Sequence, residues 1–402
     1  MSRLSAKLQI NYEKVLMFLF FYVNLQKRND MRILYVTDAL AVWGGIERVL
    51  SDKMNYFVRE YGYDVYVVTA DQGEHPIPFP LDERIHIADL KIRFHQQYQY
   101  SGIKRWLESR KLKKLYENRL KSYIEEISPD VISCIRDGCT GAVLHLNNSI
   151  PVIFESHAMY RDVEFENSTI LHRLSIYLDR KKYNKLNKIV TLTQGDAEDW
   201  KHVCNNVCVI PNVVHLNESE KYSKCTAKRA IFVGRFDLQK DLGSLIEVWA
   251  LVQQRYPEWF LDVYGNGELK PFFERIVLEK KLNIVIHPAV PNIMDKYIES
   301  SMLLMTSLYE PFGLVLAEAM SCGLPVVAFD CPYGPADIIN DGVDGFLVEN
   351  RNIEAYFRKV CQLIENEALR VKMGQDAVVS SRRYRVESIM PKWDLLFRSL
   401  MG

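Results

Sequence analysis

"SLYEPFGLVLAEAMSCGLPVV", residues 307–327, connects the end of one apolar segment to the start of the next. The connection passes through a turn that contains Pro311 and Gly313, and then through a segment rich in Ala, Leu, Val and Met. Strand, turn, helix and strand in this order are typical of a parallel α/β sheet. Apolar side chains surround the axis of segment 314–320, so we expect a largely buried helix, although it carries a carboxylate at Glu318.

The same alternation of short apolar runs and helix-period segments extends in both directions. Strands are predicted at 32–37, 64–70, 131–135, 151–156 and 188–193, and again at 229–235, 259–265, 283–290, 302–307 and 324–330. A polar stretch at 211–228 separates the two sets. We therefore predict an α/β protein with two Rossmann-like domains facing across a cleft, residues 31–212 and 229–385. A linker at 213–228 joins them, and an amphipathic helix at 386–402 ends the chain.

Composition excludes several classes of protein. A chain of 402 residues is long enough for two or three domains, and 48% hydrophobic with 25% charged residues is the balance of a globular protein. Lys plus Arg equals Asp plus Glu at 51 each, which gives no bulk electrostatic reason to bind nucleic acid. Eight cysteines without paired CxxC spacing argue against zinc and disulfide staples, and favour a reducing cytoplasm.

The first thirty residues differ from the rest. "VLMFLFFYV" at 15–23 is about half the length of a membrane-spanning helix, and no small-residue cleavage site follows it. We interpret residues 1–30 as an appendage, for example from an upstream start codon; a membrane-surface anchor is the alternative.

Two glutamates, Glu310 and Glu318, lie in the segment 307–327. Ligands of parallel sheets bind at the carboxyl ends of the strands, where Glu310 follows the strand at 302–307. Gly313 allows close approach to the backbone, and the helix after it begins with free N–H groups that suit an anion such as pyrophosphate. A buried Glu318 needs strong donors, which a sugar diol would supply. From the residues alone, a glutamate that emerges at a helix edge or pairs with an arginine explains Glu318 equally well.

A second element, "FVGRFDLQKDLGSLIEV" at 232–248, places Arg235 and Lys240 after a strand. Two cations there could neutralise a diphosphate, in a chain where we find no Asp-x-Asp pair or His cluster for a metal. Ordinary surface charges remain the alternative, more so for Lys240 than for Arg235.

Three further signals are weaker. Gly44 and Gly45 follow the first strand like a phosphate-approaching loop, but match neither GxGxxG nor a Walker sequence. Gly265 stands at another strand end without a complete dinucleotide fingerprint. His157 lies just past the strand at 151–156, where a functional role competes with a structural one.

Together these residues resemble the family 4 retaining glycosyltransferases of the GT-B fold, over essentially the whole chain from Met31. Glu310 and Glu318 fit the family's pair of glutamates separated by seven residues, and Gly234-Arg235 with Lys240 fits its Gly-Arg-then-Lys element. "DCPYGPADIINDGVDGFLV" at 330–348 is similar to bacterial members that build surface polysaccharides. Two positions depart from the family, since Asp241 and Pro288 stand where it often has glycine.

The resemblance implies a metal-independent hexosyltransferase (EC 2.4) that needs no cofactor. Glu310 would contact hydroxyls of the transferred sugar and Glu318 the ribose diol, while Arg235 and Lys240 would bind the diphosphate. His157 would lie near the anomeric carbon. The remaining donor-binding positions would be Gly44, Gly45, Gly265 and the backbone amides around Phe312, Gly313 and Leu314. The donor would be a UDP-sugar, and the acceptor a glycan or lipid-linked saccharide.

Segment 91–123 concerns the acceptor side. It holds ten Lys or Arg against two Glu, with Ile103, Trp106, Leu107, Leu115, Tyr116 and Leu120 near helical spacing. Such a surface could contact an anionic membrane from the cytoplasmic side; a solvated charged helix is the alternative.

Two other classes stay open. A non-catalytic GT-B scaffold should have lost one of the cleft charges, and a nicotinamide-dependent oxidoreductase should carry a complete dinucleotide fingerprint. Within the enzyme class, a sugar-phosphate synthase of the same fold remains an alternative.

Overall fold

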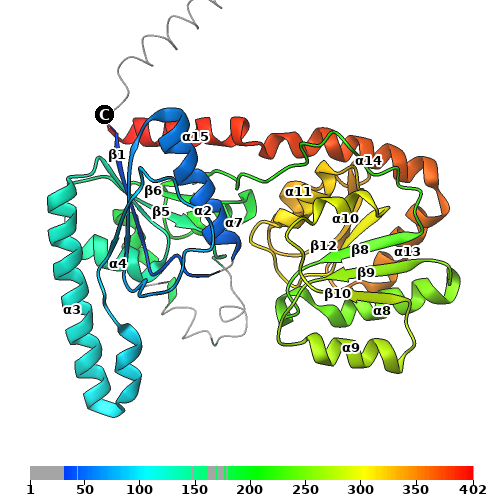
Figure 1. Ribbon diagram of the computed structural model, residues 1–402, viewed down its shortest axis with the longest axis horizontal. Coiled ribbons are helices and arrows are strands. Elements are labelled where there is room, and N and C mark those ends of the chain that lie inside the picture. Colours follow the sequence, from blue (N-terminus) through cyan, green and yellow to red (C-terminus); the bar gives the residue numbers. More distant parts are fainter. Residues whose placement is uncertain are drawn as a thin grey trace, which may run out of the picture. The chain divides into compact units, whose positions relative to one another are not determined.

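The structure, a computed structural model, describes residues 31–42, 44–146, 149–160, 169, 176–177 and 180–401. The predicted appendage at 1–30 lies outside them. The chain divides into two compact units (Figure 1). Unit 1 comprises Met1–Glu155, Lys185–Asn187 and Phe397–Gly402, and unit 2 comprises Ser156–Asn184 and Lys188–Leu396.

The first sheet has seven strands in the order β3-β2-β1-β4-β5-β6-β7. They are β1 (Arg32–Thr37), β2 (Asp64–Thr69), β3 (His86–Asp89), β4 (Val131–Cys134), β5 (Val152–Ser156), β6 (Lys188–Thr191) and β7 (Val207–Val209). β1 pairs in parallel with β2 and β4, so that Ile33 lies opposite both Val65 and Val131. Five consecutive residues of β1 are buried, as expected where both faces of a parallel sheet are covered.

Helices follow most of these strands. They are α2 (Gly45–Tyr56), which continues into the π-helical turn η1 (Phe57–Tyr61), α3 (Gly102–Ile127), α4 (Asp137–His145) and α7 (Gln194–Lys201). Two 3-10 turns, η2 (Phe94–Gln99) and η3 (Lys181–Lys185), also occur among the described residues of this part of the chain. α3 is the cyan helix in Figure 1, and its buried positions Leu112, Tyr116, Leu120 and Ile124 recur every four residues along one side.

The second sheet has six strands in the order β10-β9-β8-β11-β12-β13. They are β8 (Arg229–Val233), β9 (Phe260–Tyr264), β10 (Ile284–His287), β11 (Met302–Met305), β12 (Val326–Asp330) and β13 (Gly345–Glu349). All five pairings between them are parallel.

The two faces of the second sheet have separate cores. Phe232 of β8 packs in one core with side chains of α8 (Leu242–Arg255), α9 (Lys270–Glu279) and α13 (Ile353–Glu365). Its neighbour Ile231 packs in the other core with α10 (Met294–Ile298), α11 (Leu314–Ser321) and α12 (Gly334–Ile338). Successive strand residues point to opposite faces, so the alternation produces a helix–sheet–helix sandwich. Helices α14 (Glu367–Ser381) and α15 (Val386–Leu400), with the turn η5 (Arg382–Tyr384), end the chain.

The strand order reverses direction at one place in each sheet. In the first sheet the reversal falls between β1 and β4, and in the second between β8 and β11. The loops that leave the carboxyl ends of two such strands diverge, and the crevice between them is the usual ligand site of a doubly wound sheet. The loops after β8 and β11 carry the quoted glutamate, arginine and lysine residues.

The predicted α/β architecture with parallel sheets is confirmed, and each of the ten predicted runs contains a strand. Three strands were missed. β3, β7 and β13 lie at sheet edges, and the first two have no fully buried residue, so they lack the continuous apolar run that marks an inner strand. The helix predicted near the C-terminus is α15. Within the described ranges, no helix combines the length and apolar character required to cross a bilayer.

Candidate functional site

The loop after β8 is organised by two aspartates. Asp237 accepts a hydrogen bond from the backbone N–H of Lys240 at 3.2 Å, which closes the 3-10 turn η4 (Leu238–Lys240). Asp241 then caps α8 by accepting from the N–H of Ser244 at 3.2 Å. Asp241 has a φ of 42°, in the left-handed region that favours glycine. Asp241 stands where the family often has glycine. Aspartate can adopt the same left-handed conformation, and its side chain also caps the helix.

The loop after β11 is bound to the loop after β8 by hydrogen bonds. The Thr306 hydroxyl lies 3.0 Å from the carbonyl oxygen of Lys240, and the Leu308 N–H donates to the carbonyl of Gln239 at 2.8 Å. The Gln239 side chain returns a bond to the carbonyl of Tyr309 at 3.1 Å. Adjacent strands bring the two loops together, and these bonds then fix their register.

Lys240 and Glu310 meet at the centre of this arrangement. The Lys240 ammonium donates to Glu310 Oε2, which also accepts from the Ser307 hydroxyl at 3.2 Å. Each charged side chain is only 11% exposed. Burial raises the pKa of the nearby Cys331 thiol to about 12, and the Glu310 charge adds to this effect. Among the described residues both bonds to the carboxylate use Oε2, so Oε1 is left for a ligand hydroxyl.

A third loop, after β12, holds the backbone of Glu310. The Glu310 N–H donates to the carbonyl of Pro332, and its own carbonyl accepts from the N–H of Gly334 at 2.9 Å. A side chain at Gly334 would overlap the carbonyl of Phe312, so this close approach requires glycine.

Gly313 is the N-cap residue of α11 and has a φ of 98°, a left-handed conformation that strains any other residue. It offers no side-chain cap. The N–H of Leu316 donates to the Gly313 carbonyl at 2.9 Å, whereas the N–H of Leu314, at the first position of the helix, suits an anion. Phe312 before it is buried against Tyr384 in an edge contact of 5.3 Å. The helix therefore begins at a fixed place, at Leu314, four residues after Glu310.

Glu318 lies in a buried setting, as expected from the helix that carries it. Residues Leu316–Ser321 of α11 are buried, and Glu318 is 7% exposed. Burial and then the Glu318 charge raise the pKa of Tyr297 in α10 well above its usual value. Burial also raises the pKa of Cys322 to about 12; a hydrogen bond with Ser321 lowers it, and the Glu318 charge adds to the increase. The carboxylate thus acts electrostatically on two buried neighbours.

The other predicted residues of the second sheet have different surroundings. The Arg235 side chain is 75% exposed and forms an ion pair with Asp237 at 3.2 Å. A Cβ on Gly265 would collide with the carbonyl of Gly234, and one on Gly267 with the backbone of Phe236. These glycines let the loop after β9 pack on the loop after β8, which is a structural reason for their presence.

The remaining predicted residues belong to the first sheet. Gly44 precedes α2, where the absence of a side chain leaves room for the Glu47 carboxylate, which is 3.4 Å from Arg136. Gly45 is the first residue of α2. His157 directly follows β5 and is 8% exposed.

Sequence reasoning missed several parts of the site. Thr306, Ser307 and Gln239 fix or contact the central pair, and Tyr297 lies beside Glu318. The run Thr306-Ser307 at a strand end was an available signal, because small hydroxyl residues there are well placed to bond neighbouring loops. Within the described ranges, no group of three or more metal-binding side chains occurs, and metal independence stays a prediction.

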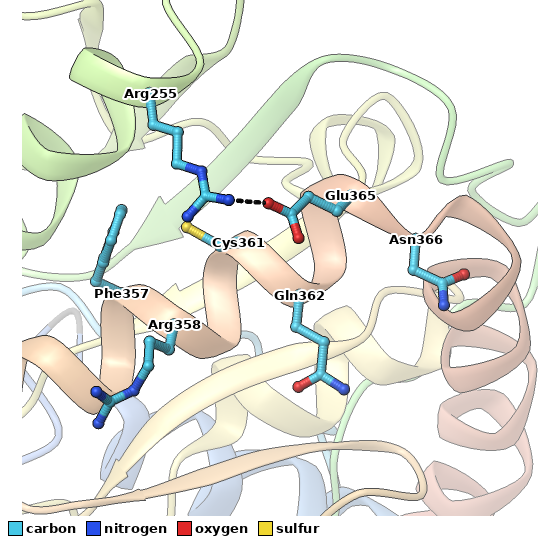
Figure 2. Close-up of a pocket in the computed structure, with 7 residues that line it drawn as sticks. All are labelled: Arg255, Phe357, Arg358, Cys361, Gln362, Glu365 and Asn366. Atoms are coloured by element: carbon cyan, nitrogen blue, oxygen red, sulfur yellow. Dashed lines mark hydrogen bonds and ion pairs between the residues drawn. The ribbon is translucent and has the colours of Figure 1, made fainter.

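A pocket of about 520 Å³ lies elsewhere, along α13 (Figure 2). Its lining residues are Arg255, Phe357, Arg358, Cys361, Gln362, Glu365 and Asn366. Arg255 and Glu365 form an ion pair of 2.7 Å, but both side chains are about half exposed, so the pair contributes less than about 1 kcal/mol. No lining residue comes from the loops after β8, β11 or β12, so we assign no function to this pocket.

Two doubly wound parallel sheets, with a helix start that lacks a side-chain cap and a lysine–glutamate pair at a switch point, are typical of nucleotide-binding α/β enzymes. Family models give the finer assignment. The model for Glycosyltransferase Family 4 matches residues 43–218, and the model for Glycosyl transferases group 1 matches residues 217–378.

Similarities to individual glycosyltransferases support the same family assignment. The chain is 30% identical over 376 residues to the amylovoran biosynthesis glycosyltransferase AmsD of Erwinia amylovora, covering 90% of this chain and 98% of the relative. It is 32% identical over 221 residues to the poly(ribitol-phosphate) alpha-N-acetylglucosaminyltransferase of Staphylococcus aureus, covering 54% and 45%. The crystal structure of Anabaena HepE with UDP has a TM-score of 0.71 at 16% identity, covering 92% and 100%. The protein therefore belongs to glycosyltransferase family 4 and has the GT-B fold.

Proposed function

We propose that this glycosyltransferase transfers a sugar from a UDP-sugar to a glycan or lipid-linked saccharide in polysaccharide biosynthesis, with retention of anomeric configuration and without a metal ion. The observation that carries the proposal is the Lys240–Glu310 pair, held beside the start of α11 at the switch point of the second sheet. Relatives support the substrate class, since AmsD is named for amylovoran biosynthesis and HepE is solved with UDP.

The pair joins the two kinds of contact that a nucleotide-sugar needs. Lys240 supplies a positive charge for the diphosphate, and Glu310 Oε1 accepts from a hydroxyl of the sugar. The N–H groups at the start of α11 donate to the distal phosphate. Arg235, which is exposed and paired with Asp237 in the loop after β8, binds the same phosphate. Glu318, buried in the same helix, accepts from the ribose diol.

Retention follows in this proposal from attack on the face that the diphosphate leaves. The bond between the anomeric carbon and the phosphate oxygen breaks, and a bond to the acceptor oxygen forms on the same face. The acceptor hydroxyl proton passes to the departing diphosphate, so no covalent enzyme intermediate is needed. His157 near the anomeric carbon orients the reacting sugar.

Lys240 and Arg235 take the electrostatic role that a divalent cation has in other transferases. Activity should therefore persist in excess EDTA. A loss of activity in EDTA that magnesium or manganese restores would contradict metal independence.

The donor is tested first by binding. UDP, GDP and ADP are added separately, and thermal unfolding is followed for the wild type, Glu318→Ala and the exposed control Glu354→Gln. A ligand at about a hundredfold over Kd stabilises the folded state by roughly 2.7 kcal/mol. We expect a shift with UDP in the wild type and the control and none in Glu318→Ala; no shift with any nucleotide favours the non-catalytic scaffold.

Chemistry is tested by transfer. Glu310→Ala and Arg235→Ala should abolish transfer from the UDP-sugar to saccharide acceptors, while Glu354→Gln keeps it. NMR of the product should show the anomeric configuration of the donor. An inverted product would refute retention, and full activity in Glu310→Ala would refute the assigned site.

We further propose a cytoplasmic location at the inner face of the membrane, from the first turns of α3. Ile103, Trp106 and Leu107 are 78%, 55% and 55% exposed, although they occupy i, i+3 and i+4 positions of one helix face. A groove of about 820 Å³ follows, lined by Trp106, Arg110, Lys111, Lys113, Lys114, Glu117 and His145. Apolar side chains beside a cluster of cations suit an anionic bilayer surface.

Sedimentation with vesicles tests this surface. Lys111, Lys113 and Lys114 are changed together to Gln, and the exposed lysines Lys224, Lys280 and Lys281 serve as the matched control. The wild type and the control should bind vesicles that contain phosphatidylglycerol, and the α3 variant should not. Equal binding of both variants would remove the membrane proposal.

A further inference from the structure

The segment that carries His157 is bound to the start of α7. The backbone N–H of Tyr160 donates to Asp196 Oδ1 at 2.7 Å, and the other carboxylate oxygen is 3.4 Å from the Ser156 hydroxyl. Asp196 is 3% exposed and lies in the first turn of α7, whose cap residue Thr193 accepts from its N–H at 3.3 Å. One buried carboxyl thus spans both sides of His157.

Whether every polar group in this network can be hydrogen-bonded depends on the protonation state of Asp196. The Ser156 oxygen accepts from Trp200 Nε1 at 3.3 Å and lies 2.8 Å from the carbonyl of Ala158. Ser156 has one proton, so its hydroxyl cannot donate to both Ala158 and an ionised Asp196. A protonated Asp196 can instead donate to Ser156, which then donates to Ala158, and every polar group has a partner.

Burial favours the neutral form of Asp196. It raises the pKa of this carboxyl to about 7 although the hydrogen bonds from Tyr160 and Ser156 lower it, and the charge of Asp199 adds to the increase. Arg180 opposes it; its guanidinium also donates to the Tyr160 carbonyl and lies 4.2 Å from the Tyr160 ring. The Tyr160 ring meets Trp200 edge-on at 5.2 Å. The segment is therefore held from two sides, by α7 and by Arg180.

We propose that Asp196 is a positioning residue, which in its protonated form holds Ser156–Tyr160 in place and so fixes His157 for transfer. This inference rests on the proposed function, in which His157 orients the reacting sugar. Misplacement of such a group by about 1 Å can cost on the order of a hundredfold in rate. When Asp196 ionises, it accepts a hydrogen bond from the Ser156 hydroxyl, and the bond from that hydroxyl to the Ala158 carbonyl, next to His157, is lost. Transfer should consequently decline as the pH rises through about 7.

Amide exchange tests the contact without any substrate. The Tyr160 N–H should be protected from exchange in the wild type and in Asp196→Asn, whose side-chain oxygen can still accept from it. Protection should disappear in Asp196→Ala, while Glu198→Gln, on the exposed side of the same helix, behaves like the wild type. An unprotected Tyr160 in the wild type, or a protected one in Asp196→Ala, would overturn the proposal.

Kinetics tests the role. Asparagine copies the neutral acid, because it accepts from Tyr160 and donates to Ser156. Asp196→Asn should therefore keep kcat/KM near that of the wild type at about pH 6, and should lack the decline above about pH 7. Asp196→Ala should lower kcat by about tenfold or more with little change in donor KM. Other groups can shape both profiles, so the difference between the wild type and Asp196→Asn is the decisive quantity.

The outcomes separate the two proposals. Asp196 has no positioning role if the wild type transfers sugar and Asp196→Ala has the same kcat as the wild type. The same conclusion follows if kcat/KM of Asp196→Asn still declines above about pH 7. If the wild type transfers no sugar from any nucleotide-sugar, the proposed function fails, and the positioning role for transfer fails with it. Unfolding curves at about pH 6 confirm that each variant is folded.

Discussion

Removing Lys240 should destabilise the protein more than removing any exposed lysine. Lys240 and Glu310 are each 11% exposed, so in Lys240→Met the Glu310 carboxylate is left in a poorly solvated place without its cation. Breaking a buried pair costs roughly 3–5 kcal/mol. The Ser307 hydroxyl still donates to the carboxylate, so we expect a value near the lower end, about 3 kcal/mol. At about 2–4 °C per kcal/mol, Tm should fall by roughly 6–12 °C.

The control is an ordinary surface pair. Lys228, directly before β8, lies 3.4 Å from Glu258, with side chains 60% and 48% exposed. Lys228→Met should therefore leave Tm almost unchanged, because an exposed pair is screened by solvent. Urea unfolding can be followed by tryptophan fluorescence, since Trp249 and Trp259 are buried in the core of the second sheet.

A double variant decides whether the cost comes from the pair. Lys240→Met combined with Glu310→Leu places two apolar side chains where two charges were, which is often neutral or stabilising. We expect the double variant to be more stable than the sum of the single effects by about 1–3 kcal/mol, and to be inactive. Additive single effects, or a Lys240→Met cost no larger than that of the surface control, would refute the reasoning.

Three other expectations follow from particular contacts. Gly265→Ala should destabilise by roughly 1–3 kcal/mol because its Cβ meets the Gly234 carbonyl, while Gly141→Ala in α4, with open space around it, should be neutral or stabilising; equal Tm changes would contradict this. The pKa of Asp196 is raised from 3.8 to about 7, so the folded state binds its proton more tightly than the unfolded chain. The stability from this group is complete below about pH 4 and is lost as the pH rises to about 7, by at most about 4 kcal/mol. Asp196→Asn should flatten the corresponding part of the Tm curve, and an unchanged slope would disprove the assignment. Trp106→Ser should weaken binding to phosphatidylglycerol vesicles without changing transfer to a water-soluble acceptor, and retained vesicle binding would exclude insertion of this side chain.

The α3 segment illustrates what a local pattern leaves undecided. Six apolar residues near helical spacing predicted one amphipathic stripe, but the structure divides them between two environments. Tyr116 and Leu120 are buried, whereas Ile103, Trp106 and Leu107 are exposed. Spacing along a helix defines a face, but only the neighbouring elements determine how far along the helix that face is covered.

Asp196 and Gly265 show the same limit. Nothing in the sequence around Asp196 marks it, because its partners Ser156 and Tyr160 come from another segment. Gly265 suggested a ligand loop, yet the group that requires its missing side chain is the carbonyl of Gly234.

The sequence by itself located ten of the thirteen strands that the structure describes, the buried helix around Glu318 and the placement of Glu310, Arg235 and Lys240 in loops after strands. These features depend on local periodicity and on glycine and proline, which act over a few residues. Only the tertiary structure decided that Lys240 donates to Glu310, seventy residues away, that Asp241 replaces glycine in a left-handed conformation, and that Arg235 remains exposed. Strand order makes β8 the neighbour of β11, and such long-range pairing arises from packing of the whole sheet rather than from any one segment.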